Sequence, residues 1–336
     1  MSEEKATGTV SEEKATGTVS EEKATGTVSE EKEYGTYDAP WTKTFDLAFL
    51  FMWIYALIGL TVYTIWYDNK GAVDREFFAF GMTKIVIVGV ISLVGGLICR
   101  KFCATDEKGF IVYTRPTKFK VNYTRKLQHF AAYLAPLINP FGKHEGLLPH
   151  LWETLFVMLT FLLLIKPLRE NCRFFMLQFN SMDRPEDRPH TLKWIILGNL
   201  LPGLLLSVTF QNFFENKLHE PYLVMIIVLA VSIGDGLAEP IGKYFGKHKY
   251  TVPAWNFKRS YTRSYEGSAC VFFTTLIAIF FFHGEFDTAR QFIAALVILP
   301  PLMTFAEAFA PHSMDTPLMM LSGYTVLAGI CCWGWF

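Results

Sequence analysis

Apolar runs of about the length that crosses a lipid bilayer recur along most of this chain. A membrane-spanning helix needs about 20 consecutive, mainly apolar residues. Only 18% of the residues are charged, against about 25% in an average soluble chain. Because a soluble domain would have to leave many of these runs in water, the sequence predicts an integral membrane protein built from helices. The eight clear runs are Phe45–Trp66, Phe78–Ile98, Leu147–Ile165, Leu192–Phe210, Pro221–Ile241, Ser268–Phe282, Arg290–Ala310 and Pro317–Phe336.

The basic residues of the loops indicate a ninth span. Leu127–Phe141 is a shorter apolar run that contains two prolines. Three loops are rich in Lys and Arg, with eight in Arg100–Lys126, six in Lys166–Lys193 and six in Lys243–Arg263. Basic loops stay on the cytosolic side of a membrane, and a ninth span places all three loops there. Without it, the first loop would lie opposite the other two. We therefore predict an all-α bundle of about nine spans with a cytosolic N-terminus.

The first 44 residues differ from the rest in composition. The unit SEEKATGTV occurs three times from Ser2 to Val28, and a fourth copy begins at Ser29. Such a polar, Glu-rich segment buries too little apolar surface to offset its ordering entropy, and it lacks the apolar stretch of a signal peptide. We predict a disordered cytosolic tail over 1–44, two transmembrane helices and a basic loop over 45–124, and a transmembrane domain over 125–336 that contains the polar motifs described below.

The charge balance and the cysteines exclude several functions. Lys and Arg total 31, as do Asp and Glu, so the chain lacks the basic excess of a nucleic-acid-binding protein. The six cysteines form no paired C-x-x-C motif, and neither a disulfide scaffold nor a zinc site is indicated. No targeting signal is visible. We expect the endoplasmic reticulum membrane, with a plastid or bacterial inner membrane as the alternatives.

Two carboxylates, Asp235 and Glu239, lie within the apolar run Pro221–Ile241. Acids inside a span are costly and mark functional sites by default. A separation of four residues puts both on one face of a helix, where they repel each other unless a cation lies between them or one is protonated. Mg²⁺ takes one or two carboxylates and completes its shell with water and nucleotide phosphates. The pattern favours a metal site, and an ion pair with Lys243 is the alternative.

Glycines and basic residues follow this pair in the sequence. Glycines let a backbone approach a ligand and present N–H groups to phosphate oxygens, while Arg and Lys add positive charge. The candidates for phosphate binding after the pair are Gly242, Lys243, Gly246, Lys247, Lys249, Lys258 and Arg263, with the acid Glu266 among them. Two further polar clusters are expected on the same membrane side, Arg125 with Lys126 and Glu307 with Asp315. For the basic pair, a juxtamembrane anchor is the alternative to phosphate binding.

Four polar motifs follow one another between Arg125 and the C-terminus. They are Arg125-Lys126-x-x-His129, the segment Gly234–Tyr250, the block Glu266-Gly267-Ser268, and Glu307 followed by Pro311-His312-Ser313-x-Asp315. Their combination and order resemble the polyprenol kinase family. That family includes phytol, farnesol and dolichol kinases and the CTP-dependent diacylglycerol kinase, and it is related to phosphatidate cytidylyltransferases. Many relatives have Asp-Asn where this chain has Asp315-Thr316, a difference that concerns the lipid substrate.

The resemblance implies an integral-membrane enzyme that transfers a phosphoryl group from CTP, or another nucleoside triphosphate, to a lipid alcohol such as phytol, farnesol, dolichol or diacylglycerol. It also implies roles for the candidate residues on the cytosolic face. Asp235 and Glu239 would hold Mg²⁺ and the nucleotide, Lys243, Lys247 and Lys249 would bind phosphates near Lys258, Arg263 and Glu266, and Glu307 and Asp315 would complete the polar centre.

Two other functions fit parts of the pattern. A phosphatidate cytidylyltransferase would use the same CTP and Mg²⁺ but release pyrophosphate and make CDP-diacylglycerol. The longer lysine-arginine-aspartate signature expected of that enzyme is absent near the C-terminus. An ion-coupled transporter would use Asp235, Glu239 and Glu307 as ion ligands beside broken helices. The internal two-fold repetition expected of a transporter is not found between the two halves of the sequence.

Overall fold

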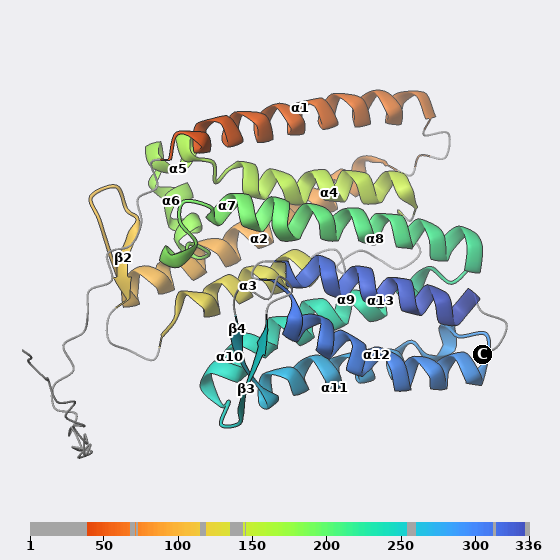
Figure 1. Ribbon diagram of the computed structural model, residues 1–336. Helices are drawn as coiled ribbons and strands as arrows, with labels where there is room; N and C mark the ends of the chain where they lie inside the picture. The colour runs from red at the N-terminus through yellow and green to blue at the C-terminus, as the bar shows by residue number, and fades with distance from the viewer. Residues whose placement is uncertain are drawn as a thin grey trace, which may run out of the picture. The chain divides into compact units, whose positions relative to one another are not determined.

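Figure 1 shows the computed structural model of the protein, which describes residues 39–67, 71, 73–114, 119–134, 144, 146–253, 260–311 and 314–332. These residues belong to one compact unit of helices that lie side by side. The predicted parts 45–124 and 125–336 therefore belong to the same compact unit. The first helix, α1, begins at Trp41, so the predicted tail over 1–44 includes four residues that are helical. Residues 1–38 of the predicted tail lie outside the described residues.

Five helical segments of the described chain are long and apolar enough to cross a membrane. Each has between 21 and 28 residues, which meets the length that a bilayer requires. They are α1 (Trp41–Tyr67), α2 (Arg75–Phe102), Thr191–Leu218, Pro221–Tyr244 and α12 (Ala289–Phe309). Two shorter apolar helices are α4 (Leu147–Leu162) and α11 (Tyr265–Phe281). The chain is thus a multi-pass membrane protein.

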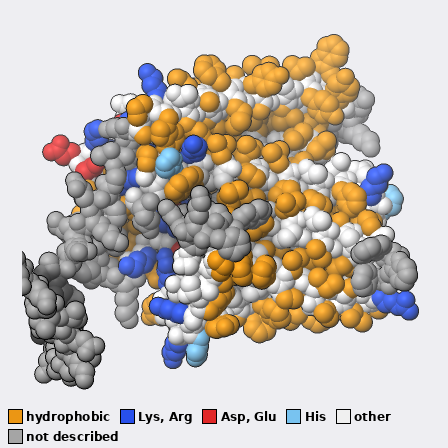
Figure 2. Space-filling view, viewed as in Figure 1, with side chains coloured by type: hydrophobic (Ala, Val, Ile, Leu, Met, Phe, Trp, Pro, Cys, Tyr) orange, Lys and Arg blue, Asp and Glu red, His pale blue; other side chains and the backbone are white. Residues whose placement is uncertain are grey.

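The outer surface of the bundle is apolar. Tyr55 and Ile65 of α1 are 82% and 76% exposed, and Val86 of α2 is 60% exposed. Figure 2 shows hydrophobic side chains along the helices of the visible face, with more of the basic side chains toward the end that carries the β-hairpins. Such a surface is unfavourable in water and favourable against lipid chains.

Two of the long segments change helix type along their length. Thr191–Leu218 consists of α7 (Thr191–Lys193), a π-helical turn (Trp194–Leu200), α8 (Leu201–Phe213) and a second π-helical turn (Phe214–Leu218). Pro221–Tyr244 consists of a 3₁₀ turn (Pro221–Leu223), α9 (Val224–Leu229), a π-helical turn (Ala230–Asp235) and α10 (Gly236–Tyr244). π-Helical turns are rare and frequently occur at functional sites. Those at Trp194–Leu200 and Ala230–Asp235 carry residues of the cavity described below.

The remaining helices are shorter or lie at the ends of the bundle. They are α3 (Val121–Leu134), α5 (Lys166–Asn171), α6 (Arg173–Asn180), α13 (Asp315–Cys332) and the 3₁₀ turns Pro185–Asp187 and His283–Glu285. Each predicted span overlaps one of the described helices. The predicted third span, Leu127–Phe141, overlaps α3, which begins at Val121 and is not among the five helices of the described chain that are long and apolar enough to cross a membrane. Arg125 and Lys126 are therefore helical and are fixed by the packing of α3.

Two apolar clusters hold the helices together. The larger joins α9, α11, α12 and α13 around the fully buried side chains of Leu299, Met303 and Tyr324. The second joins α1, α4, α6 and the turn that follows α7. Between α2 and α6 the backbones nearly touch, since a Cβ atom at Gly96 would lie 1.8 Å from the carbonyl oxygen of Leu177. Small residues permit this close approach of helices in membranes.

Two antiparallel β-hairpins lie at one end of the bundle, together with α5 and α6 (Figure 1). One pairs β1 (Cys103–Thr105) with β2 (Ile111–Thr114), and the other pairs β3 (Lys249–Pro253) with β4 (Ser260–Ser264). These elements belong to the three basic loops, which thus share one end. The all-α prediction is confirmed for the bundle but misses the hairpins. Their β-branched and aromatic residues favour strands, and each run is too short to mark a span.

Candidate active site

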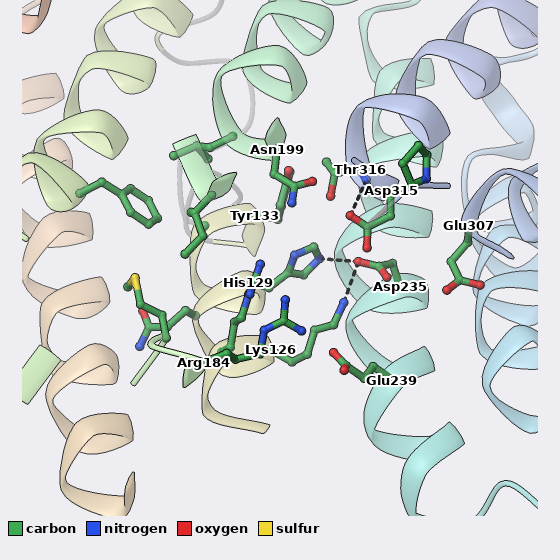
Figure 3. A pocket seen from close by; sticks show the side chains of 18 of the residues that line it. Lys126, His129, Tyr133, Arg184, Asn199, Asp235, Glu239, Glu307, Asp315 and Thr316 are labelled. Atoms are coloured by element: carbon green, nitrogen blue, oxygen red, sulfur yellow. Dashed lines mark hydrogen bonds and ion pairs between the residues drawn. The ribbon is translucent and has the colours of Figure 1, made fainter. Parts of the chain in front are cut away.

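Charged side chains that are far apart in the sequence meet at one cavity of about 190 Å³ (Figure 3). The cavity lies among α3, α10, β4, the end of α12 and the start of α13. Its charged lining residues are the basic Arg125, Lys126, Arg184 and Arg263 and the acidic Asp235, Glu239, Glu307 and Asp315. All four predicted catalytic carboxylates, and three of the predicted phosphate-binding cations, are therefore together. Buried charges cost free energy unless they are paired, so this arrangement indicates a site.

Asp235 lies at the centre of the cavity and is only 3% exposed. Its Oδ2 atom is 2.9 Å from Nζ of Lys126 and 3.7 Å from Nε2 of His129. The ring of His129 is held in turn, because its Nε2 lies 3.1 Å from the carbonyl oxygen of Val231. Asp235 ends the π-helical turn Ala230–Asp235, which sets the direction of its side chain. Lys126 and His129 both come from α3, so this helix supplies the polar partners of Asp235.

Glu239 lies one helical turn after Asp235 and has other partners. Lys243 Nζ is 2.7 Å from Glu239 Oε1, and the side-chain amide of Asn122 donates a hydrogen bond to the same oxygen. The ion pair between Glu239 and Lys243, which the sequence gives as the alternative to a metal site, is thus present. Asn122 was not predicted as a site residue. Nothing in its local sequence marks it, because its partner is 117 residues away.

Arg263 joins β4 to α12. Its guanidinium lies 3.1 Å from Oε1 of Glu307 and donates a hydrogen bond to the Glu307 carbonyl oxygen at 3.2 Å. Burial lowers the pKa of Arg263, but the neighbouring carboxylates, Glu307 first among them, outweigh burial and raise that pKa above its ordinary value. Arg263 is therefore a permanent cation at the cavity wall.

Asp315 begins α13 and differs from the other carboxylates of the cavity. Its Oδ1 atom accepts a hydrogen bond from the backbone N–H of Thr316 at 3.0 Å. Asp235, Glu239 and Glu307 each have a basic side chain within 4.0 Å, whereas the described residues give Asp315 no such ion pair. Among the described residues, the Asp315 carboxylate thus has the fewest contacts with basic side chains of the four acids.

A cluster of two arginines around Asp187 forms another wall. Asp187 is 1% exposed, and its Oδ2 lies 2.5 Å from Arg125 and 2.7 Å from Arg184. Arg184 and Asp187 were not predicted as site residues. The signal is the charge-rich stretch Asp183–Arg188, which lies within a basic loop and was interpreted only as a marker of the cytosolic side.

The glycine-rich turn lies outside the cavity. The lining residues of the cavity do not include Gly242, Lys243, Gly246, Lys247, Lys249 or Glu266, and Lys258 lies outside the described residues. The backbone N–H groups of Lys247 and His248 donate to Oε1 of Glu266, at 3.0 and 3.2 Å. In this arrangement a protein carboxylate occupies two backbone amides of the turn that was predicted to bind phosphate.

Packing also explains the two glycines of this turn. A Cβ atom at Gly246 would lie 2.1 Å from the carbonyl oxygen of Gly242 and 2.8 Å from Ser264, while one at Gly242 would lie 2.8 Å from the Ser264 hydroxyl. Only glycine allows the end of α10 to lie this close to β4. The turn thus fixes the strand that carries Arg263.

The cavity suits Mg²⁺ only together with a nucleotide. Within the described residues, the side chains whose ligand atoms lie close enough together to hold a metal ion are Asp74, Glu76 and His144. None of these three residues lines the cavity. The four cavity carboxylates are hard oxygen donors, but Asp235 and Glu239 contact different cations. A Mg²⁺ ion here would take one or two of them and complete its shell with phosphate oxygens and water, as Mg²⁺ commonly does.

The chain was compared with protein-family models, with curated proteins and with solved structures, and none of the three comparisons found a match.

Proposed function

We propose that this protein is a membrane-embedded kinase that transfers a phosphoryl group from CTP, or another nucleoside triphosphate, to a lipid alcohol. The observation that carries the proposal is the cavity, in which four basic and four acidic side chains from distant parts of the sequence line one space. Phosphoryl transfer depends mostly on positioning and on neutralising phosphate charge, and these residues suit both tasks. The three basic loops lie at the same end (Figure 1), which we assign to the cytosol, where nucleotides are supplied.

The cations of the site are held in place before a ligand binds. Lys126 contacts Asp235, Arg263 contacts Glu307, and Arg125 contacts Asp187. Donors that are already oriented stabilise developing charge without reorganisation during the reaction. Arginine retains further N–H groups for phosphate oxygens after one contact with a carboxylate. We assign phosphate binding to these three cations and to Arg184.

Asp235 and Glu239 are the residues that would hold Mg²⁺, which neutralises phosphate charge when it is bound. The acceptor hydroxyl must lose its proton as it attacks phosphorus, so a base within reach is needed. Asp315 fits this role best, because Asp235, Glu239 and Glu307 each contact a basic side chain, whereas the described residues give Asp315 no such ion pair. We assign the base to Asp315.

The test uses the full-length chain in lipid nanodiscs with labelled CTP and Mg²⁺. Phytol, farnesol, dolichol and diacylglycerol are offered separately, and the products are separated. Release of CDP together with a lipid monophosphate is the expected result. Pyrophosphate together with a CDP-lipid would instead identify a cytidylyltransferase. If no nucleotide raises the melting temperature and the protein carries an ion-dependent flux in liposomes, it is a transporter.

A further inference from the structure

A second cavity, of about 290 Å³, adjoins the charged one. Its walls come from α2, α6 and the end of α4, and most of the side chains that line it are apolar. Among them are Val88, Leu93, Phe161, Leu164 and Phe175. Val86, Val90 and Phe174, which also line it, are each more than half exposed on the outer surface. That surface faces lipid, so the cavity opens sideways into the bilayer. We call it the α2–α6 groove.

Gln128 stands where the two cavities meet. It lines both of them, as do Phe161 and Met182. Gln128 is 7% exposed, and its Oε1 accepts a hydrogen bond from the Ser92 hydroxyl at 2.6 Å. Its Nε2 atom is buried and has no hydrogen-bond partner in the described structure. Buried donors are nearly always satisfied, and one that is not calls for an explanation. A ligand oxygen at the junction would supply the missing acceptor.

We propose that the α2–α6 groove holds the hydrocarbon chain of the acceptor alcohol and that Gln128 Nε2 binds the hydroxyl oxygen of that alcohol at the junction. This proposal rests on the lipid-kinase function proposed above and specifies how its substrate enters. A long-chain alcohol combines one polar atom with an apolar tail. Gln128 matches the polar atom, and the groove matches the tail. A donor on the oxygen leaves the hydroxyl proton free to pass to a carboxylate of the charged cavity.

Besides Gln128, the polar side chains that line the groove are Ser92, Thr160 and Gln178, and the two hydroxyls among them are already engaged. The hydroxyl of Ser92 donates to Gln128, and that of Thr160 donates to the Val157 carbonyl oxygen at 2.7 Å. The surface of the groove is therefore suited to a hydrocarbon, and a soluble phosphate or sugar would find few partners there. Specificity for the lipid then comes from the size of the groove rather than from the charged cavity.

Gly89 offers a way to fill the groove without disturbing the fold. It lines the groove on α2, and a Cβ atom there would meet no atom within 4 Å. Gly59 of α1 is equally open but lines none of the described cavities near the site. Gly89→Phe and Gly59→Phe are thus matched substitutions, each within an apolar helix. Only the first should exclude a hydrocarbon chain from the groove.

The experiment measures lipid binding and activity separately in nanodiscs. A long-chain alcohol with a diazirine on its chain is photocrosslinked to the full-length protein, with unlabelled farnesol as competitor. We expect labelling of α2 or α6 peptides that farnesol reduces. Gly89→Phe should abolish this labelling and raise the KM for the alcohol by about tenfold or more, and Gly59→Phe should change neither.

Gln128→Met tests the polar end of the groove with little change of volume. We expect an increase of about tenfold in the KM for the alcohol, whereas the shift in melting temperature caused by Mg·CTP stays as in the wild type. An active enzyme in which Gly89→Phe and Gln128→Met change neither labelling nor KM would overturn the proposal. A protein without kinase activity that still shows competed labelling in the groove would refute the kinase function and retain the lipid site.

Discussion

Lys126 Nζ lies 2.9 Å from Asp235 Oδ2, although 109 residues separate the two in the sequence. Their side chains are 11% and 4% exposed. The contact joins α3 to the π-helical turn before α10, and it holds a cation and an acid at the centre of the cavity (Figure 3). Each charge makes the burial of the other tolerable. The pair therefore has a structural role, and mutations can separate this role from the catalytic role proposed above.

Lys126→Met should lower both stability and activity, because it leaves Asp235 buried without its main cation. Breaking a buried pair from one side costs about 3–5 kcal/mol. Adding Asp235→Asn removes the unpaired charge, so the double variant should recover most of the melting temperature while remaining inactive. Thermal unfolding in detergent and the phosphoryl-transfer assay measure the two effects. Recovery of activity in the double variant would show that neither residue takes part in the reaction.

Asp315→Asn should reduce turnover without weakening nucleotide binding. If Asp315 accepts the proton of the alcohol, its loss should lower kcat by about 100-fold or more. The amide keeps the size of the side chain and can still accept the hydrogen bond from the Thr316 N–H. The melting temperature and its increase with Mg·CTP should therefore remain near the wild-type values.

Asp287→Asn is the matched control for this substitution. Asp287 is exposed and precedes α12, at the opposite end of that helix from Glu307. It should leave kcat and the melting temperature unchanged. A wild-type kcat in Asp315→Asn would assign the base to another carboxylate, and a lost response to Mg·CTP would assign Asp315 to nucleotide binding.

The five long apolar helices and the central acids could be predicted from the sequence because both depend on local pattern. An apolar run of sufficient length identifies a span wherever it packs, and a carboxylate within such a run is conspicuous in any context. The side assigned to the basic loops followed from charge alone. For these reasons Asp235, Glu239 and Glu307 could be identified as candidate site residues without knowing which side chains they contact in the structure.

The partners of those acids could not be predicted, because they depend on packing between distant helices. Asn122 contacts Glu239 across 117 residues, and Arg125 contacts Asp187 across 62. The segment from Gly242 to Lys249 shows a different difficulty. Glycines next to lysines suit phosphate binding and close packing equally well, and only the positions of Ser264 and Glu266 distinguish the two.

Gly246→Ala should therefore destabilise the protein rather than weaken nucleotide binding directly. Its Cβ atom would lie 2.1 Å from the Gly242 carbonyl oxygen, and relieving such a clash costs about 1–3 kcal/mol. Thermal unfolding checks this, with Gly329→Ala of α13 as the control, since a Cβ atom there meets nothing within 4 Å. A stable Gly246→Ala protein with weakened CTP binding would restore the phosphate-binding interpretation of the turn.

An ion pair inside the bundle joins α2 to α4. Lys84 Nζ of α2 lies 2.6 Å from Glu153 Oε1 of α4, and the two side chains are 11% and 16% exposed. The pair borders the apolar space next to the α2–α6 groove, where Ile85, Val88 and Gln128 line both cavities. An uncompensated charge at this mostly buried position is costly, so the Lys84 ammonium depends on the Glu153 carboxylate.

Glu153→Leu alone should destabilise the protein by about 3–5 kcal/mol, because it strands the Lys84 ammonium. The double variant Lys84→Met, Glu153→Leu should be close to the wild type, since well-packed apolar residues replace buried pairs at little cost. Glu170→Leu, at the more exposed Lys166–Glu170 pair, should change stability by less than about 1 kcal/mol. Unfolding midpoints of the four proteins decide the matter. If the double variant is as unstable as Glu153→Leu, then packing of the replaced side chains, rather than an unpaired charge, accounts for the loss.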